Sequence, residues 1–212
     1  MRNNPNITIN LKTIKFATFV VPFILLMFSI SAFAQNVDID ILKEINLNRN
    51  KSLDPSFRFI TNSVTPISIA IPCGFIACAL TTKDSISRVN AILISSSLAL
   101  SGVLATSLKY GIGRQRPYIT YPIIEKVTSE GTPSFPSGHT SFAFSTATSL
   151  SIAYPKWYVI APSFIWAGCV GYSRMDLGVH YPSDVLAGAI IGSASAYLSY
   201  KLNKWYYKKI FR

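Results

Sequence analysis

The chain has 212 residues, which fits one domain; half of them are hydrophobic, only 14% are charged, and the mean hydropathy is +0.34. A soluble domain of this length is rarely so apolar, and the apolar residues occur in blocks, so composition favours a membrane protein. The net charge of +11 could suit nucleic acid, but no basic patch is interleaved with aromatic residues. We therefore expect no nucleic-acid partner, and attribute the charge to cytoplasmic anchoring and a phosphate site.

Residues 1–34 have the pattern of a secretory signal peptide. An apolar run over 16–33 ends in Ala32-Phe33-Ala34, the A-x-A form of a cleavage site, and it follows a basic start made of Arg2, Lys12 and Lys15. The alternative is an uncleaved first transmembrane helix. We favour cleavage because the run is short for a membrane span, and both alternatives export the segment that follows.

Residues 35–62 mix charged and apolar residues, and we expect a periplasmic or interfacial segment lying on the membrane surface. Asp54-Pro55 is expected to open a short helix within it. Residues 63–212 then form the membrane-embedded domain. Five apolar segments follow one another in that domain: 63–80, 89–108, 139–154, 157–171 and 185–200.

These segments predict an all-α fold, a polytopic membrane helical bundle with about five to six transmembrane helices. Gly188 and Gly192 are four residues apart and are expected to let two helices approach closely. The three cysteines lie inside apolar runs without metal-ligand spacing, and we expect them to be buried: Cys73, Cys78 and Cys169.

Lysine and arginine in the flanks predict the orientation. The C-terminal tail after Tyr200 is basic, so it is expected to be cytoplasmic. Counting back through five spans places residues 109–138 and 172–184 outside the cytoplasm. The polar residues of both stretches then lie on one face of the membrane, where they can form a single site.

The first polar cluster is Lys109 with Arg116 and Pro117. A guanidinium fork matches phosphate oxygens and an ammonium adds a point charge, so the pair can clamp a phosphate. The alternative is a pair of interfacial cations that reach toward water. Arg114, between them, is expected to be solvated or to contact lipid headgroups.

The second cluster, Pro136-Ser137-Gly138-His139, precedes the apolar run from residue 140. Ser137 is a good helix N-cap, Gly138 lets backbone approach a ligand, and the N–H groups at a helix start attract anions. His139 can reach a phosphate ester oxygen from this position. The alternative is a plain junction between a loop and a helix.

The third cluster is Ser173-Arg174 with His180 and Asp184. His180 and Asp184 are four residues apart and are expected on one helical face. A carboxylate that fixes one ring nitrogen leaves the other free to act as a nucleophile. The alternative is a purely structural His–Asp pair.

Together the spacings Lys-x6-Arg-Pro, Pro-Ser-Gly-His and Ser-Arg-x5-His-x3-Asp resemble the type 2 phosphatidic acid phosphatase family over roughly residues 90–200. The resemblance implies a core shared with vanadium haloperoxidases and a metal-independent reaction without a cofactor. It implies that His180 attacks phosphorus, Asp184 orients it, and His139 is the general acid. The phosphate would be held by Lys109, Arg116, Ser137, Gly138 and Arg174.

The expected function is therefore hydrolysis of a membrane lipid phosphate through a phosphohistidine, at the outer side of the cytoplasmic membrane. Phosphatidic acid, phosphatidylglycerophosphate, polyprenyl diphosphates and lipid A phosphates all fit, and no oligomeric state is indicated. Two alternatives stay open: a non-enzymatic protein that binds or transports phospholipid headgroups, and a vanadate-dependent haloperoxidase-like enzyme.

Overall fold

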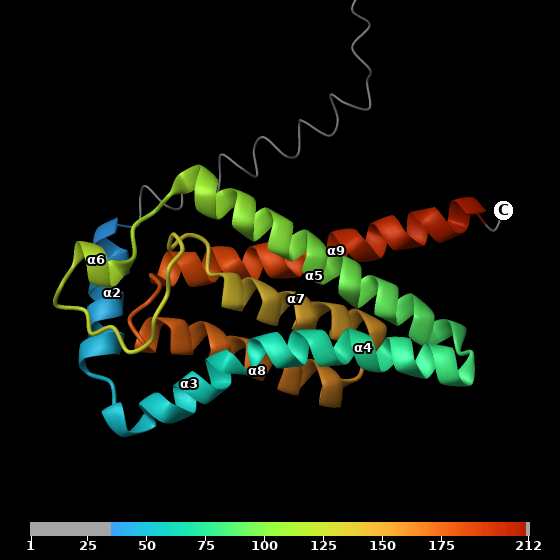
Figure 1. Cartoon of the computed structure of the whole chain (residues 1–212), viewed down its shortest axis with the longest axis horizontal. Helices are drawn as coiled ribbons and strands as arrows, with labels where there is room; N and C mark the ends of the chain where they lie inside the picture. Colours follow the sequence, from blue (N-terminus) through green and yellow to red (C-terminus); the bar gives the residue numbers. More distant parts are fainter. Residues whose placement is uncertain (1–34, 211–212) are drawn as a thin grey trace, which may run out of the picture.

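The computed structural model describes residues 35–210, which contain helices and connecting loops but no strand (Figure 1). The all-α fold class predicted from the sequence is confirmed. The alternatives for residues 1–34 lie outside the described residues. In chain order the elements are α2 (Gln35–Leu47), the short 3-10 helix η1 (Lys51–Leu53), α3 (Asp54–Asn62), α4 (Val64–Thr82), α5 (Ser85–Ile112), α6 (Pro117–Thr120), α7 (Gly138–Ala153), α8 (Trp157–Asp176) and α9 (Pro182–Ile210).

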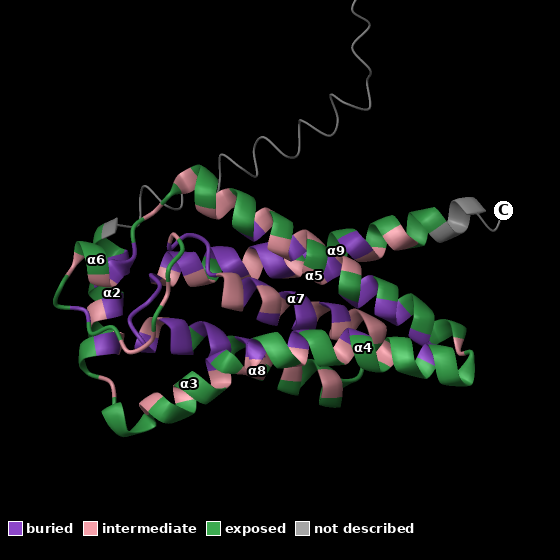
Figure 2. Cartoon of the chain, in the orientation of Figure 1, coloured by how far each residue is buried: buried purple, intermediate pink, exposed green. Residues whose placement is uncertain are grey.

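The long helices α4, α5, α7, α8 and α9 run along the long axis of the molecule and correspond to the five predicted apolar segments (Figure 1). Helix α7 is central, because it packs against each of the other four. Helices α2 and α6 and the loop that precedes α7 lie at one end of the bundle, whereas α9 ends at the opposite end. Buried residues are concentrated toward the α2 and α6 end (Figure 2).

Helices α7 and α9 approach closely at two glycines, as predicted. A Cβ atom added at Gly188 would lie 2.6 Å from the carbonyl oxygen of Ser137. One added at Gly192 would overlap the carbonyl oxygen of Ser141. No larger residue fits at either position without moving the helices apart. This contact fixes the start of α7 beside the start of α9.

Local sequence signals end or begin three helices at the same end of the bundle. Gly113 adopts a left-handed conformation (φ 64°) and donates its N–H to the carbonyl of Lys109, which ends α5. Ser137 caps α7 by accepting a hydrogen bond from the Thr140 N–H at 3.4 Å. Pro182 is the first residue of α9. These signals bring all three predicted clusters to one end.

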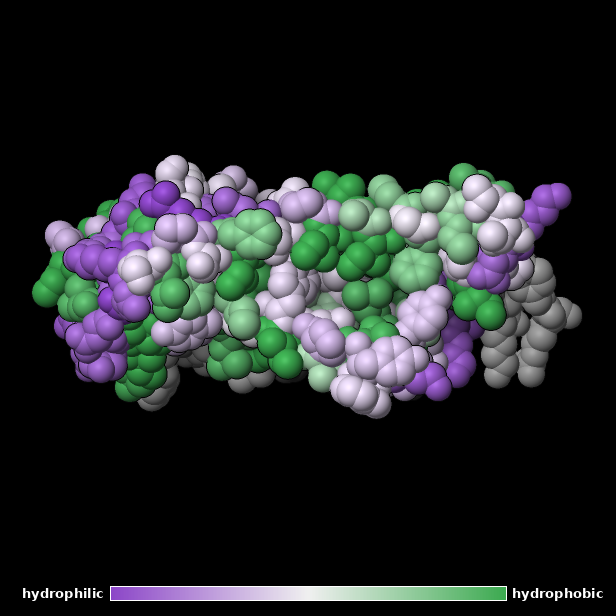
Figure 3. All heavy atoms as spheres, turned by 90° about the horizontal axis from the view of Figure 1, so that it is seen from below, coloured by the Kyte–Doolittle hydropathy of each residue, from purple (hydrophilic) through white to green (hydrophobic). Residues whose placement is uncertain are grey.

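The chain is a membrane protein whose described part contains three helical segments long and apolar enough to cross a bilayer: Lys51–Thr82, Ser85–Thr120 and Pro182–Tyr206. Figure 3 shows hydrophobic side chains over the middle of the molecule and hydrophilic ones gathered toward the end that carries α2 and α6. Helix α7, with 16 residues, and α8 are not among the three segments. Spans at these two helices stay a prediction.

The prediction that the cysteines are buried is wrong. Cys73, Cys78 and Cys169 are free and exposed on α4 and α8. In a membrane bundle the outer face of a helix meets lipid, so an apolar run no longer indicates burial inside the protein.

Helices α2 and α3 pack onto the end of the bundle. Ile39 and Leu42 of α2 are buried in a cluster with Ile124 and Tyr181. The apolar face of α2 therefore rests on protein at this end of the bundle. The expected position of this segment at the membrane surface stays a prediction. Asp54-Pro55 opens α3, as predicted.

Candidate active site

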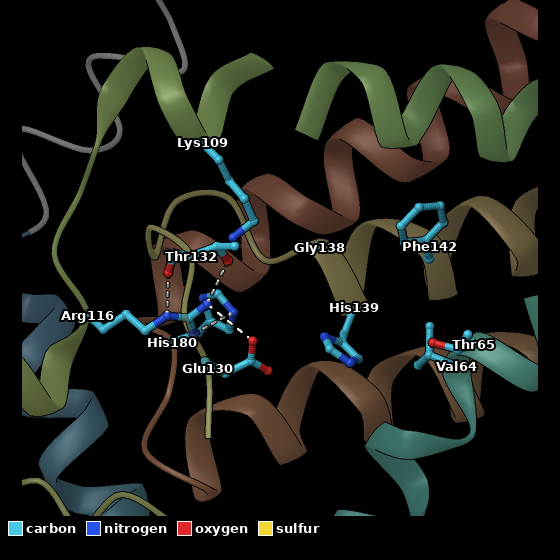
Figure 4. A pocket seen from close by; sticks show the side chains of 10 residues that line it. All are labelled: Val64, Thr65, Lys109, Arg116, Glu130, Thr132, Gly138, His139, Phe142 and His180. Carbon is cyan, nitrogen blue, oxygen red and sulfur yellow. Dashed lines mark hydrogen bonds and ion pairs between the residues drawn. The ribbon is translucent and has the colours of Figure 1, made fainter. Parts of the chain in front are cut away.

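One pocket of about 230 Å³ collects most of the predicted site residues (Figure 4). It is lined from five parts of the chain: the start of α4, the end of α5, the connection before α6, the loop 121–137 with the start of α7, and the turn before α9. The lining residues are Val64, Thr65, Lys109, Arg116, Glu130, Thr132, Gly138, His139, Phe142 and His180. Five of these were predicted from the sequence motifs.

Arg116 is almost fully buried and is held by backbone carbonyl groups. Its Nε donates to the Thr132 carbonyl at 2.7 Å and its Nη1 donates to the Val179 carbonyl at 2.8 Å. The same Nη1 lies 3.3 Å from His180 Nε2. These contacts fix the plane of the guanidinium beside the imidazole, so a group bound by Arg116 lies next to His180.

Arg174 lies behind the pocket, at the end of α8, and is also almost fully buried. Its Nη1 donates to the Thr61 hydroxyl at 2.8 Å, and its Nη2 forms an ion pair with Glu130. The neighbouring Ser173 hydroxyl donates to the Val170 carbonyl, inside its own helix. Arg174 is thus linked to the pocket through Glu130, a residue that the motifs do not include.

His180 and Asp184 are paired, but not along one helical face. His180 precedes α9, and Asp184 lies in its first turn. The distance from His180 Nδ1 to Asp184 Oδ2 is 3.4 Å. Asp184 Oδ2 also accepts the backbone N–H of Tyr181 at 3.0 Å, which pulls the turn back onto the carboxylate. The predicted pairing is confirmed, and the predicted helical placement is wrong because Pro182 starts the helix later.

The contacts of His180 define which nitrogen faces the pocket. An arginine side chain only donates hydrogen bonds, so the approach of Arg116 Nη1 to Nε2 requires a lone pair on Nε2. The proton of a neutral imidazole then sits on Nδ1, toward Asp184. Burial, reinforced by Arg174, Arg116 and Lys109, holds the pKa of His180 well below its usual value. The ring is therefore neutral, with its unprotonated nitrogen directed at the pocket.

The prediction that Arg114 is solvated or contacts lipid is wrong. Its Nη1 donates to Asp184 Oδ1 at 2.7 Å, its Nη2 donates to Asp38 Oδ2 at 2.9 Å, and its guanidinium stacks on the Tyr181 ring. Asp38 from α2 in turn accepts the Ser183 N–H at 2.9 Å. Arg114 thus joins α2 to the start of α9 and holds one oxygen of Asp184.

Ser134 holds the other oxygen of Asp184. Its hydroxyl donates to Oδ2 at 2.5 Å and lies 3.5 Å from His180 Nδ1. Asp184 has no exposed surface and is surrounded by donors on both sides. A carboxylate held this firmly can keep the imidazole in one orientation.

The start of α7 supplies the second histidine. Ser137 is buried, caps the helix, and donates its N–H to the carbonyl of Asp184 at 3.0 Å. Gly138 and His139 face the pocket, and a Cβ atom at Gly138 would lie 3.8 Å from Lys109 Cε. Ser137 therefore positions this corner and does not line the pocket, whereas Gly138 lines it, as predicted.

Lys109 enters the pocket from the end of α5. Its Nζ donates to the Pro133 carbonyl at 2.6 Å, which ties the ammonium to the loop 121–137. The pocket thus receives positive charge from Lys109 and Arg116, with Arg174 behind Glu130, while His139 and His180 both line it. Buried cations beside two imidazoles suit an anionic substrate such as a phosphate ester.

Comparison with known proteins agrees with this geometry. The family model of the PAP2 superfamily matches residues 90–208, more than half of the chain. The chain belongs to the PAP2 superfamily. The match includes every residue of the three clusters and confirms the resemblance predicted from their spacing.

Individual relatives support the same assignment. An undecaprenyl-diphosphatase of Sulfolobus acidocaldarius is 36% identical over 52% of this chain and 54% of its own. The chain thus spans about half the length of this curated relative. The crystal structure of Aquifex aeolicus LpxE has a TM-score of 0.68 and 29% identity, and covers 78% of this chain and 95% of that one. A PAP2-type phosphatidylglycerolphosphate phosphatase from Bacillus subtilis has a TM-score of 0.69 and 26% identity, covering 92% and 96%.

The PAP2 motifs do not include several polar residues that shape this site. Glu130, Thr132 and Ser134 belong to the loop between α6 and α7, and Asp38 and Thr61 lie outside the matched range. Loop residues have no periodicity, and their partners lie far away in sequence. For Glu130 the sequence does contain one signal. Arginines that are buried need a counter-charge, and the acidic residues between the first two clusters are Glu125 and Glu130, so one of them was a candidate.

Proposed function

We propose that the protein is a lipid phosphate phosphatase that forms a phosphohistidine at His180. The observation that carries the proposal is the orientation of the His180 ring. Its unprotonated Nε2 points into a cationic pocket, while Nδ1 faces a carboxylate fixed by Arg114 and Ser134. A neutral imidazole held in this way is a ready nucleophile.

The reaction follows from the positions of the two histidines. As a phosphate binds, Arg116 Nη1 must turn from His180 Nε2 to a phosphate oxygen, which frees the lone pair of Nε2. This lone pair then forms a bond to phosphorus as the bond from phosphorus to the lipid oxygen breaks.

Burial and the nearby Arg174 lower the pKa of His139 to about 4 in the free pocket, so the acid role requires the negative charge of a bound phosphate to restore its proton. His139 then gives this proton to the leaving oxygen, which needs it because an alkoxide is a poor leaving group. Water then attacks phosphorus, the N–P bond breaks, and the proton of that water returns to His139.

The cations stabilise the charge that spreads over the phosphoryl oxygens during both steps. Lys109, Arg116 and Arg174 are the candidates for this role, together with the first-turn N–H groups of α7 at Gly138. Within the described part of the chain, no three His, Cys, Asp or Glu side chains gather in a way that could hold a metal ion. Metal independence stays a prediction for a chelator to test.

A lipid substrate is supported by the surroundings of the pocket. Phe142 lines the pocket and also an apolar groove of about 650 Å³ on the surface of α5. The groove is formed by Leu98, Ala99, Gly102, Val103, Thr106 and Ser107 together with Phe142. A lipid could place its phosphate beside His180 and its chain along the groove. Similar proteins are named as undecaprenyl-diphosphatase, lipid A 1-phosphatase and phosphatidylglycerolphosphate phosphatase.

The proposed location is the cytoplasmic membrane, with the pocket on the extracytoplasmic side. Support comes from the arrangement of the bundle. The pocket includes His180, just before the start of α9, and the start and the end of α9 lie at opposite ends of the bundle (Figure 1). If the basic tail faces the cytoplasm, the pocket faces outward. The proposed functional unit includes residues 35–62, since Asp38 and Thr61 contact the site.

The test is phosphate release from a panel of lipid phosphates by the protein purified in detergent, with and without excess EDTA. The panel contains phosphatidic acid, phosphatidylglycerophosphate, undecaprenyl diphosphate and lipid A. Activity that survives EDTA and disappears in His180→Ala is expected. Binding of the lipids without turnover would indicate a headgroup-binding protein, and halide oxidation with vanadate and peroxide would indicate haloperoxidase chemistry.

A further inference from the structure

Glu130 places a carboxylate in the part of the pocket where a phosphate is expected. One of its oxygens pairs with Arg174 Nη2 and the other lies 3.5 Å from Arg116 Nη2. It therefore bridges the two guanidinium groups that the proposed function assigns to phosphate. Figure 4 shows its carboxyl group directed into the space between His180 and His139.

The pocket's charges explain why a carboxylate rests there. Glu130 is the only acidic residue among those that line the pocket. Asp184, the nearest alternative, is already held by Arg114, Ser134 and the Tyr181 N–H. Buried guanidinium groups without a counter-charge are costly, so Glu130 stabilises Arg116 and Arg174 in place. Although burial opposes ionisation, the two arginines outweigh it and lower the pKa of Glu130, which stays charged.

The side chain of Glu130 is placed so that it can move away from Arg116 and Arg174. It belongs to the loop between α6 and α7, and its side chain is 19% exposed, whereas those of Arg116 and Arg174 are 2% and 1% exposed. Arg116 and Arg174 each keep other partners, the Thr132 carbonyl and the Thr61 hydroxyl. Withdrawal of the carboxylate would therefore leave both cations anchored, with Arg116 lining the pocket and Arg174 uncovered behind the position that Glu130 held.

We propose that Glu130 is a displaceable internal anion that occupies the phosphate-binding position until a phosphate group replaces it. The inference rests on the proposed phosphate site. A phosphate that contacts both Arg116 and Arg174 needs the same guanidinium N–H groups that Glu130 uses, so the two anions compete. Glu130 then lowers phosphate affinity while it keeps the arginines ordered. It thereby helps determine which headgroups bind and how readily the product phosphate leaves.

The alternative is that Glu130 stays in place and orients the arginines while phosphate binds elsewhere in the pocket. The two ideas predict opposite effects of Glu130→Gln. Loss of a competitor strengthens phosphate binding, whereas loss of a permanent support weakens it. Glu125→Gln is the matched control, because Glu125 lies in the same loop but pairs with Arg49 and Lys51, away from the pocket.

The experiment follows the thermal unfolding midpoint of the full chain in detergent as inorganic phosphate or orthovanadate is added. For Glu130→Gln we expect a lower midpoint without ligand and half-maximal stabilisation at about tenfold lower phosphate, as for loss of one charge-assisted contact. Glu125→Gln should match the wild type in its phosphate dependence. Glu130→Asp, which keeps the charge on a shorter side chain, should also bind phosphate more tightly, and it serves if the glutamine variant does not fold.

Unchanged or weaker phosphate dependence in the Glu130 variants, or no phosphate effect in any variant, would overturn the inference. The assay requires no turnover, so it separates this inference from the proposed function. Tighter phosphate binding in Glu130→Gln without lipid hydrolysis by the wild type would reject the phosphatase and retain the displaceable anion. Hydrolysis by the wild type with unaltered phosphate binding in the variants would do the reverse.

Discussion

Arg114 and Arg116 are two residues apart and offer a matched pair of Arg→Lys substitutions. Arg116 lines the pocket and touches His180, whereas Arg114 points away and bridges Asp184 and Asp38. We therefore expect Arg116→Lys to weaken phosphate binding and transition-state stabilisation together. Arg114→Lys should mainly lower kcat, because the substitution disturbs the carboxylate that orients the nucleophile and leaves the phosphate contacts intact.

The size of the Arg114 effect can be argued from its contacts. A lysine reaches one carboxylate but cannot bridge two, so at least one charge-assisted hydrogen bond is lost, worth about 1.5–3 kcal/mol. Asp184 keeps Ser134 and the Tyr181 N–H, so its position is weakened but not abolished. If most of that energy orients His180, kcat falls by roughly 10- to 100-fold.

The assay measures kcat and KM on a short-chain lipid phosphate, together with orthovanadate-dependent thermal stabilisation, for both variants. Arg114→Lys is expected to retain near wild-type vanadate binding, and Arg116→Lys to lose about tenfold or more. A normal kcat in Arg114→Lys would refute its positioning role. A loss of vanadate affinity equal to that of Arg116→Lys would show that Arg114 acts directly on the phosphate.

Three further outcomes are expected. His180→Ala should abolish turnover of both lipid phosphate and p-nitrophenyl phosphate. His139→Ala should retain proportionally more activity on p-nitrophenyl phosphate, whose leaving group needs no proton. Equal fractional losses on the two substrates in His139→Ala would contradict its role as the acid. Gly102→Leu should raise KM for long-chain lipids and leave p-nitrophenyl phosphate unaffected, since an added Cβ would already lie 3.2 Å from Phe142 in the apolar groove. The pKa of His180 in the folded protein lies well below the unfolded value of about 6.5, so at lower pH the unfolded chain binds a proton that the folded chain does not. The unfolding free energy should therefore fall as pH drops below about 6.5. Thermal unfolding midpoints of the wild type and His180→Asn over this pH range test the prediction, and identical pH slopes in the two proteins would contradict it.

The sequence alone predicts the long helices and the motif residues of the pocket, but not the residues that support them. The five long helices follow from apolar blocks, and Gly188 and Gly192 indicated the close contact between α7 and α9 that the structure shows. Lys109, His139 and His180 were found because each lies beside a helix end within a motif of fixed spacing. Such signals are local, so a single sequence displays them directly.

The supporting residues could not be found in the same way. Asp38 contacts Ser183 across 145 positions, and Glu130 contacts Arg174 across 44. Neither acid has a periodicity or a motif, and each has charged neighbours that offer equally plausible partners. The error over Arg114 has the same origin, since a third cation beside a membrane surface resembles a headgroup contact until α2 folds back with Asp38.

The site contains two separate groups of ion pairs, one at the proposed phosphate position and one that orients His180. Arg116 and Arg174 share the carboxylate of Glu130 on the pocket side, while Arg114 shares those of Asp184 and Asp38 behind it. Only the first group meets a carboxylate that is partly exposed and carried by a loop. On the proposal above, an incoming phosphate exchanges with Glu130 without disturbing Arg114 and Asp184, which hold the His180 ring. With the roles proposed for Glu130 and His180, such a site binds and releases anions repeatedly while the nucleophile stays aligned.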